Sequence, residues 1–86
     1  MTYNELVNEA AKIGDWFING DHIRSFNDKG IICPITAVML NKTGQFYHLY
    51  SVNEAQAILG LSINSIKRLV READTGDRTL FRRLTI

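Results

Sequence analysis

The stretch 62–71 carries polar and basic side chains at the spacing of one helix face. An Asn amide pairs with adenine through two hydrogen bonds, an Arg guanidinium pairs with guanine, and Lys and Arg neutralise phosphates. We expect the two serines of the stretch to bind phosphates and the other four side chains to enter the major groove of DNA. The six residues are Ser62, Asn64, Ser65, Lys67, Arg68 and Arg71.

The charge distribution places basic side chains on this stretch and after it. Residues 66–86 contain six Lys or Arg and three Asp or Glu, whereas residues 1–30 contain three and five. Arg78, Arg82 and Arg83 belong to the basic segment, and we expect them to add phosphate contacts. The whole chain has a net charge of only +1, which is a poor match to a dedicated nucleic-acid-binding protein.

Two short helices joined by a tight turn must position these side chains. Ser51 and Glu54 form a capping-box start, Gly60 suits the end of the first helix, and Ser62 can cap the second. A short helix, a turn with glycine and a second helix make a helix-turn-helix unit, here residues 51–74, which often docks DNA. Its expected core side chains are Val52, Ala55, Ile58, Leu59, Leu61, Ile66, Leu69, Val70 and Ala73.

This stretch, SVNEAQAILGLSINSIKRLVREAD, resembles the helix-turn-helix of excisionase-like and MerR-like DNA-binding domains, and the resemblance implies DNA binding through the second helix. The chain departs from the family at Ile63, where family members tend to carry a polar or basic side chain. It departs again at Ala73–Asp77, where they continue with glycine and a basic strand, and about 50 residues precede a motif that usually opens the domain. The matching positions include Val52, Glu54, Ala55, Leu59, Gly60, Leu61, Ser62, Ser65, Ile66, Arg68, Leu69, Val70, Arg71 and Glu72.

A second and looser resemblance covers most of the chain. It relates the chain to small uncharacterised bacterial and phage proteins and implies no activity. On this interpretation the helix pair belongs to an all-helical domain that need not contact DNA. The pattern comprises Ile23-Arg24, Cys33-Pro34-Ile35-Thr36-Ala37-Val38, Leu59-Gly60-Leu61, Arg71-Glu72-Ala73-Asp74, Arg78 and Leu84.

Patterns for catalysis and metal binding are weak by comparison. Cys33 could pair with His22 or His48 as a thiol and an imidazole, but it lies in an apolar run, where free Cys is most often a small buried hydrophobe. The chain has no CxxC or HxxxH spacing, no glycine-rich phosphate loop and no paired carboxylates. We therefore expect no catalytic residues, no metal, no cofactor and no enzymatic activity.

The first 30 residues are expected to form one long helix, a short extended segment and a turn. Thr2 with Glu5 is another capping box, and apolar residues then recur at helical spacing, so the helix is predicted to end near Asn19-Gly20. His22–Phe26 is predicted to be extended. Asn27–Gly30 is a turn by composition, because Asn, Asp and Gly tolerate the backbone angles that turns require.

The segment Gly30–Gly44 admits two interpretations. Pro34 suits the first turn of a helix, where its missing N–H has no consequence. Against this, Ile, Thr and Val favour strands, and strands at 35–40 and 45–50 would form a hairpin like the wing of a winged helix. We favour the helix, followed by an extended 45–50.

Length and composition predict one domain, 1–86, with a mainly α-helical fold, a helix-turn-helix pair and minor extended segments. A last short helix over 78–84, capped by Asp77, completes the predicted fold. The apolar fraction of 45% favours a folded soluble domain, and a single cysteine allows no internal disulfide. No apolar run is long enough to span a membrane and the first residues do not form a secretory signal, so we expect no membrane contact and a cytoplasmic location.

Two functions remain open at this point. The first is a small non-enzymatic DNA-binding or regulatory protein, expected to act as a homodimer because two half-sites compensate for one weak site. The alternative is a helical protein-interaction or oligomerisation module of phage type, using Tyr3, Trp16 or the aromatics of 46–50. An open face carrying Asn64, Lys67 and Arg71 favours the first function, whereas a covered face favours the second.

Overall fold

The first helix, α1 (Tyr3–Ile13), begins at the predicted capping box. The Thr2 side chain accepts from the Glu5 backbone N–H at 3.1 Å, and the Glu5 carboxylate accepts from the Thr2 N–H at 2.9 Å. These bonds satisfy two of the donors that a helix start leaves free, and they hold the pKa of the Glu5 carboxyl below its usual value. The structure is a computed structural model that describes all 86 residues.

Helix α1 ends six residues before the predicted Asn19, and this part of the sequence prediction is wrong. Gly14 has a φ of 81° and Asp15 a φ of 59°, which no continuing right-handed helix permits. The next residues form strand β1 (Trp16–Asn19), in which Trp16 is buried. Phe17 matched the helical spacing only by coincidence.

Three antiparallel strands form a sheet in the order β1, β2 and β3. Strand β2 (His22–Asn27) confirms the predicted extended segment, and the predicted turn joins it to β3 (Gly30–Ile32). In the central strand β2, Ser25 pairs with Trp16 of β1 on one side and with Ile32 of β3 on the other. All three of these side chains are buried, so they define the inner face of the sheet.

The mainly α-helical fold class predicted from the sequence is therefore wrong. Five helices contain 57% of the residues, and the three-stranded antiparallel sheet contains a further 15%, which makes the fold α+β. Strands β1 and β3 were missed because each is short and acquires its hydrogen bonds from β2 rather than from its own sequence neighbours.

The ambiguous middle segment is helical, so the favoured interpretation is confirmed and the hairpin is not formed. Helix α2 (Pro34–Thr43) has Cys33 at its N-cap and ends at Gly44 in the left-handed conformation, with φ 74°. Residues 45–50, predicted to be extended, form a loop without a strand. Phe46, Tyr47 and Tyr50 of that loop pack against the hydrophobic core.

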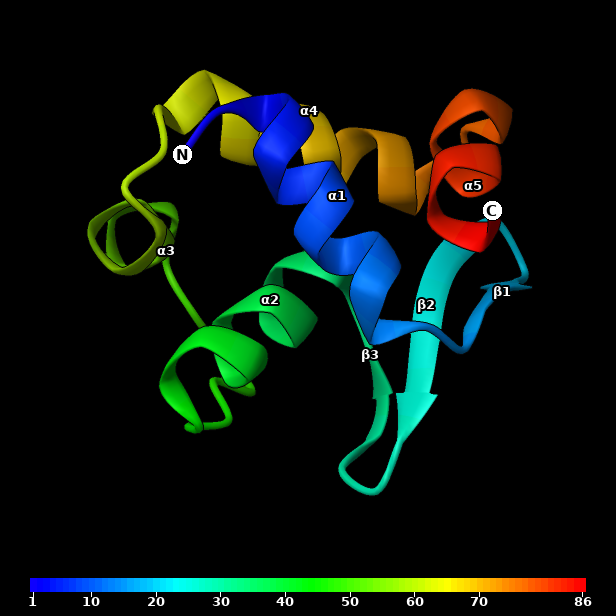
Figure 1. Cartoon of the computed structure of the whole chain (residues 1–86), viewed down its shortest axis with the longest axis horizontal. Coiled ribbons are helices and arrows are strands. Elements are labelled where there is room, and N and C mark those ends of the chain that lie inside the picture. Colours follow the sequence, from blue (N-terminus) through cyan, green and yellow to red (C-terminus); the bar gives the residue numbers. More distant parts are fainter.

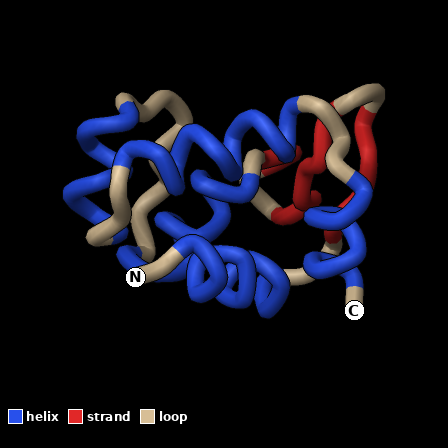
Figure 2. Tube along the Cα trace, turned by 90° about the horizontal axis from the view of Figure 1, so that it is seen from above, coloured by secondary structure: helices blue, strands red, loops and turns tan.

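The predicted helix pair and final helix are present. They are α3 (Val52–Leu59), α4 (Ile63–Asp74) and α5 (Arg78–Thr85). In Figure 1, α4 runs along the top of the molecule with α1 beside it, and the turn between β2 and β3 lies at the bottom. Figure 2 shows the strands gathered at one end, away from the N-terminus. None of the five helices combines the length and the apolar character that crossing a bilayer requires.

One hydrophobic cluster of 18 buried residues, drawn from all five helices and all three strands, joins these elements. Its most completely buried side chains include Leu6, Ile23 and Leu69. A second connection lies at Gly76, between α4 and α5, which has a φ of 65°. A Cβ at this position would lie 3.0 Å from the carbonyl oxygen of Asp21 in the β1–β2 turn, so the two turns meet backbone to backbone.

Candidate nucleic-acid interface

The turn between α3 and α4 is built by short-range hydrogen bonds that the sequence predicts. Ser51 caps α3 by accepting from the Glu54 N–H at 3.0 Å. Gly60 ends this helix with a left-handed φ of 63°, and its N–H donates to the Gln56 carbonyl at 2.9 Å. Ser62 then caps α4 by accepting from the Ser65 N–H at 3.2 Å.

The inner face of α4 anchors the helix in the core. Ile66, Leu69 and Ala73 recur at helical spacing and are fully buried. The helix packs against α1, α2, α3 and β2 through this face. All nine predicted core residues of the helix pair lie in the cluster or pack against it, because Val52, Ile58 and Val70 are partly buried and the other six are buried.

The opposite face of α4 is open. Asn64, Lys67 and Arg71 are exposed, and at 3.6 residues per turn they lie within an arc of roughly 60°. We call these three residues the α4 outer face. No other element covers it, so the condition that the sequence interpretation set for a DNA-binding helix is met.

Arg68 lies at the edge of this face and is already engaged. Its guanidinium carbon lies 3.8 Å from the centre of the Tyr3 ring, and its Nε lies 3.3 Å from the Glu72 carboxylate. The Tyr3 hydroxyl donates to the same carboxylate. Burial, and then this hydrogen bond to Glu72, raise the pKa of the Tyr3 hydroxyl above its ordinary value. Arg68 therefore connects α4 to α1, a role that the sequence did not indicate.

Ser62 and Ser65 form hydrogen bonds with each other at the N-terminus of α4. The Ser62 oxygen caps the helix, and its hydroxyl donates to the Ser65 oxygen at 3.0 Å. Ser62 is exposed and Ser65 is half-buried. A phosphate at this end of α4 would meet the Ser62 hydroxyl first, and it would have to replace the bond to Ser65.

The carboxylates near the α4 outer face are all occupied by other partners. Glu72 binds Tyr3 and Arg68, Asp74 pairs with Arg24 of β2 at 2.9 Å, and the Asp77 carboxylate caps α5 by accepting from the Leu80 N–H at 2.9 Å. The acidic residues that follow Glu72 in the sequence are thus partly neutralised by the fold.

Most cations of the C-terminal third have no such partner. The chain has three ion pairs, made by Lys12, Arg24 and Arg68. No carboxylate lies within 4.0 Å of the other cations of this region, of which all but the half-buried Arg83 are exposed. These cations are Lys67, Arg71, Arg78, Arg82 and Arg83.

Compared with protein-family models, with curated proteins and with solved structures, the chain shows no match.

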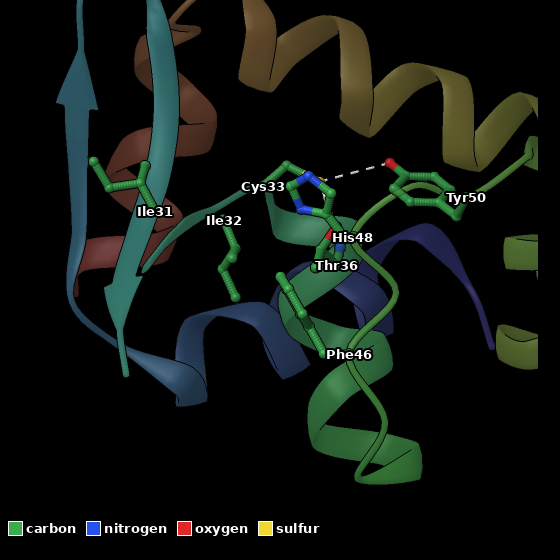
Figure 3. A pocket seen from close by; sticks show the side chains of 7 residues that line it. All are labelled: Ile31, Ile32, Cys33, Thr36, Phe46, His48 and Tyr50. Carbon is green, nitrogen blue, oxygen red and sulfur yellow. Dashed lines mark hydrogen bonds between the residues drawn. The ribbon is translucent and has the colours of Figure 1, made fainter. Parts of the chain in front are cut away.

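The cysteine and histidine considered for catalysis lie around a small hollow of about 160 Å³ (Figure 3). Cys33 caps α2 by accepting from the Thr36 N–H at 3.4 Å, and the Tyr50 hydroxyl lies 3.6 Å from its sulfur. Burial, and then the neighbouring Cys33, raise the pKa of the Tyr50 hydroxyl. His48 lines the hollow, whereas His22 does not. No group of three or more His, Cys, Asp or Glu side chains is arranged so that it could hold a metal ion.

The aromatic residues proposed as protein anchors are mostly packed inside. Trp16 is 7% exposed and donates from Nε1 to the Ala10 carbonyl at 2.8 Å, and Tyr3 is bound to Glu72. Two exposed apolar side chains lie together on the sheet instead. Phe26 is 61% exposed and Ile31 is 51% exposed, and they face each other across β2 and β3. We call this pair the hairpin patch, which sequence analysis missed because β3 was not predicted.

Proposed function

We propose that the protein binds duplex DNA through the α4 outer face. One observation carries the proposal: Asn64, Lys67 and Arg71 project together from an uncovered face of the second helix of a helix-turn-helix. An Asn amide and an Arg guanidinium are suited to base edges in the major groove, and Lys is suited to phosphates.

Charge supports the same proposal. Lys67 and Arg71 have no carboxylate partner, and neither do Arg78 and Arg82 on α5. Unpaired cations are free to displace the counterions of a phosphate backbone, which is the main source of affinity in protein–DNA binding. Arg68 is assigned a positioning role in this proposal, because its guanidinium is held on Tyr3 and Glu72.

The proposal includes a homodimer and a cytoplasmic location. The four exposed cations without a partner on α4 and α5 make a weak single site on a chain of net charge +1, and a dimer that engages two half-sites about one helical turn apart would strengthen it. Duplex DNA and the reducing conditions that keep Cys33 a free thiol are both found in the cytoplasm.

Binding to a mixed-sequence duplex over a salt series tests this function. The logarithm of the association constant should fall linearly with the logarithm of salt concentration. The variant Lys67→Ala should reduce the slope by about one, since each phosphate contact contributes about one. The matched control is Lys29→Ala in the β2–β3 turn at the other end of the molecule (Figure 1), which should leave the slope unchanged. Failure of the wild type to bind at low salt would refute the proposal.

A second candidate function is protein association through the hairpin patch. Phe26 and Ile31 are exposed apolar side chains on a sheet with a free edge at β3, and such edges pair readily with other chains. Sedimentation of the wild type and of Phe26→Thr at several concentrations tests it. An unchanged monomer in both would argue against association through this patch.

A further inference from the structure

Ile63 is the first residue of α4 and lies outside the hydrophobic core. It is 37% exposed, and it belongs neither to the buried cluster nor to the side chains packed against that cluster. Ser62 and Asn64, its neighbours in the chain, are exposed as well. A large apolar side chain therefore lies at the N-terminal end of the helix.

Helix geometry places Ile63 at the flank of the α4 outer face, roughly 40° around the helix from Lys67. Ile63 and Lys67 are one turn apart, and Asn64 and Arg71 are two turns apart on the adjoining line. When such a helix docks in the major groove, its N-terminal residues contact base edges. Ile63 and Asn64 are then the two side chains nearest the bases, and Lys67 and Arg71 follow along the helix.

We propose that Ile63 determines sequence specificity by contacting the C5-methyl group of a thymine, next to an adenine read by Asn64. This inference rests on the proposed DNA binding. The methyl group of thymine is the apolar feature that the major groove offers, and apolar side chains contact it. Cytosine carries only a hydrogen at C5 and an amino group at the adjacent C4, so Ile63 would lose the methyl contact there and would cover a donor without offering it a hydrogen-bond partner. The preferred DNA therefore carries an A·T pair at this step.

Removing one thymine methyl group at a time from the DNA tests the proposed contact of Ile63 directly. Wild-type protein is used to select a duplex from a randomised pool, and each thymine of that duplex is then replaced in turn by uracil, which lacks only the methyl group. Burial of one methyl or methylene group is worth about 0.8 kcal/mol, so one uracil position should weaken binding about fourfold. The variant Ile63→Ala should bind the thymine and uracil duplexes equally at that position.

Lys67→Ala serves as the matched control, because it should weaken binding to both duplexes and keep their ratio. Thermal unfolding of Ile63→Ala checks that the variant folds. The assignment of Ile63 is overturned if the selected duplex contains no thymine that uracil affects, or if the uracil effect persists in Ile63→Ala. Absence of salt-dependent binding by the wild type would instead overturn the proposed DNA binding and this inference with it, so the two failures are distinguishable.

Discussion

The α4 outer face and the hairpin patch are the two exposed surfaces suited to binding, and they differ in chemistry and in place. The α4 outer face is polar and basic, and its cations lack partners, whereas the hairpin patch is an apolar pair on two short strands. In Figure 1, α4 lies at the top of the molecule and the turn between β2 and β3 lies at the bottom. DNA binding and protein association, which the sequence left as rivals, therefore correspond to separate regions that can be altered one at a time.

The largest expected effect comes from the inner face of α4. Leu69 is fully buried, and Leu69→Ala should lower the free energy of unfolding by about 2–5 kcal/mol, since it removes buried methyl groups and leaves a cavity. Urea unfolding followed by circular dichroism measures this loss. Lys67→Ala on the outer face of the same helix should change the value by less than about 0.5 kcal/mol. A similar loss of unfolding free energy in the two variants would mean that Lys67, like Leu69, contributes to the packing of α4.

The next effect separates two arginines of one helix. Arg71 is free and Arg68 is held by Tyr3 and Glu72. Arg71→Ala should weaken DNA binding by about 1–3 kcal/mol, or reduce the salt slope by about one if its partner is a phosphate. Its stability should not change.

Arg68→Ala is the matched variant and should do the reverse. Loss of the ring contact and the ion pair should lower the free energy of unfolding by about 1 kcal/mol, while the salt slope stays at the wild-type value. Titrations of both variants over the same salt series give the comparison. A slope reduced equally by both substitutions would show that Arg68 leaves Tyr3 and contacts phosphate.

Alkaline pH should act at two separate places in the molecule, because each contains a tyrosine with a raised pKa. Tyr3 adjoins α4, and Tyr50 adjoins Cys33 at the start of α2. Both pKa values lie above the ordinary 10.0 in the folded protein, so folding favours the protonated hydroxyl. The stabilisation is complete below pH 10 and is lost as the pH rises beyond it, because the unfolded chain releases these protons first.

Tyr3→Phe and Tyr50→Phe divide this alkaline loss between the two regions. Between about pH 9 and pH 11, which brackets the ordinary tyrosine pKa, the free energy of unfolding should fall less in each variant than in the wild type. Urea unfolding at both pH values provides the measurement. A loss in Tyr3→Phe as steep as in the wild type would indicate that the Tyr3 hydroxyl ionises as easily in the folded chain as in the unfolded one.

The smallest expected effect is at the hairpin patch. Phe26→Thr keeps a residue that favours strands and removes the exposed ring, so the free energy of unfolding should change by no more than about 0.5 kcal/mol. The affinity for duplex DNA should be unchanged. Parallel measurements of unfolding and DNA binding test both expectations. A clear loss of DNA affinity in Phe26→Thr would mean that the hairpin patch also takes part in DNA binding.

The elements predicted correctly are those that neighbouring residues determine. Hydrogen bonds that span three or four positions mark the ends of the helix pair at Ser51, Gly60 and Ser62. Pro34 marks the start of α2, because its fixed φ suits the first helical position. Strand β1 was missed because its hydrogen bonds come from β2 and its apolar residues also fit a helical spacing. Gly14 was the local signal that could have ended the first helix earlier.

The same distinction applies to the candidate interface. The exposed arc of α4 follows from helical periodicity, so Asn64, Lys67 and Arg71 could be grouped from the sequence. The ion pair of Arg68 with Glu72 follows from the same periodicity, because the two residues are four positions apart. The contact with Tyr3 could not be predicted, because the Tyr3–Glu72 bond that completes this cluster joins residues 69 positions apart. Distant pairs of this kind also neutralise Asp74, whose charge counted against DNA binding when only the sequence was considered.

The backbone contact between Gly76 and Asp21 has a consequence for how the chain folds. It brings the turn after β1 against the turn before α5, and α5 itself packs on β1. The contact closes the stretch of chain between residues 21 and 76, and closing so long a loop costs conformational entropy. Because only the assembled core offsets this cost, the two turns should meet late in folding. Strand β1 and helix α5 should then open together as one cooperative unit. In native-state hydrogen exchange, their amide protons should share one protection energy, and Gly76→Ala should lower it in both elements.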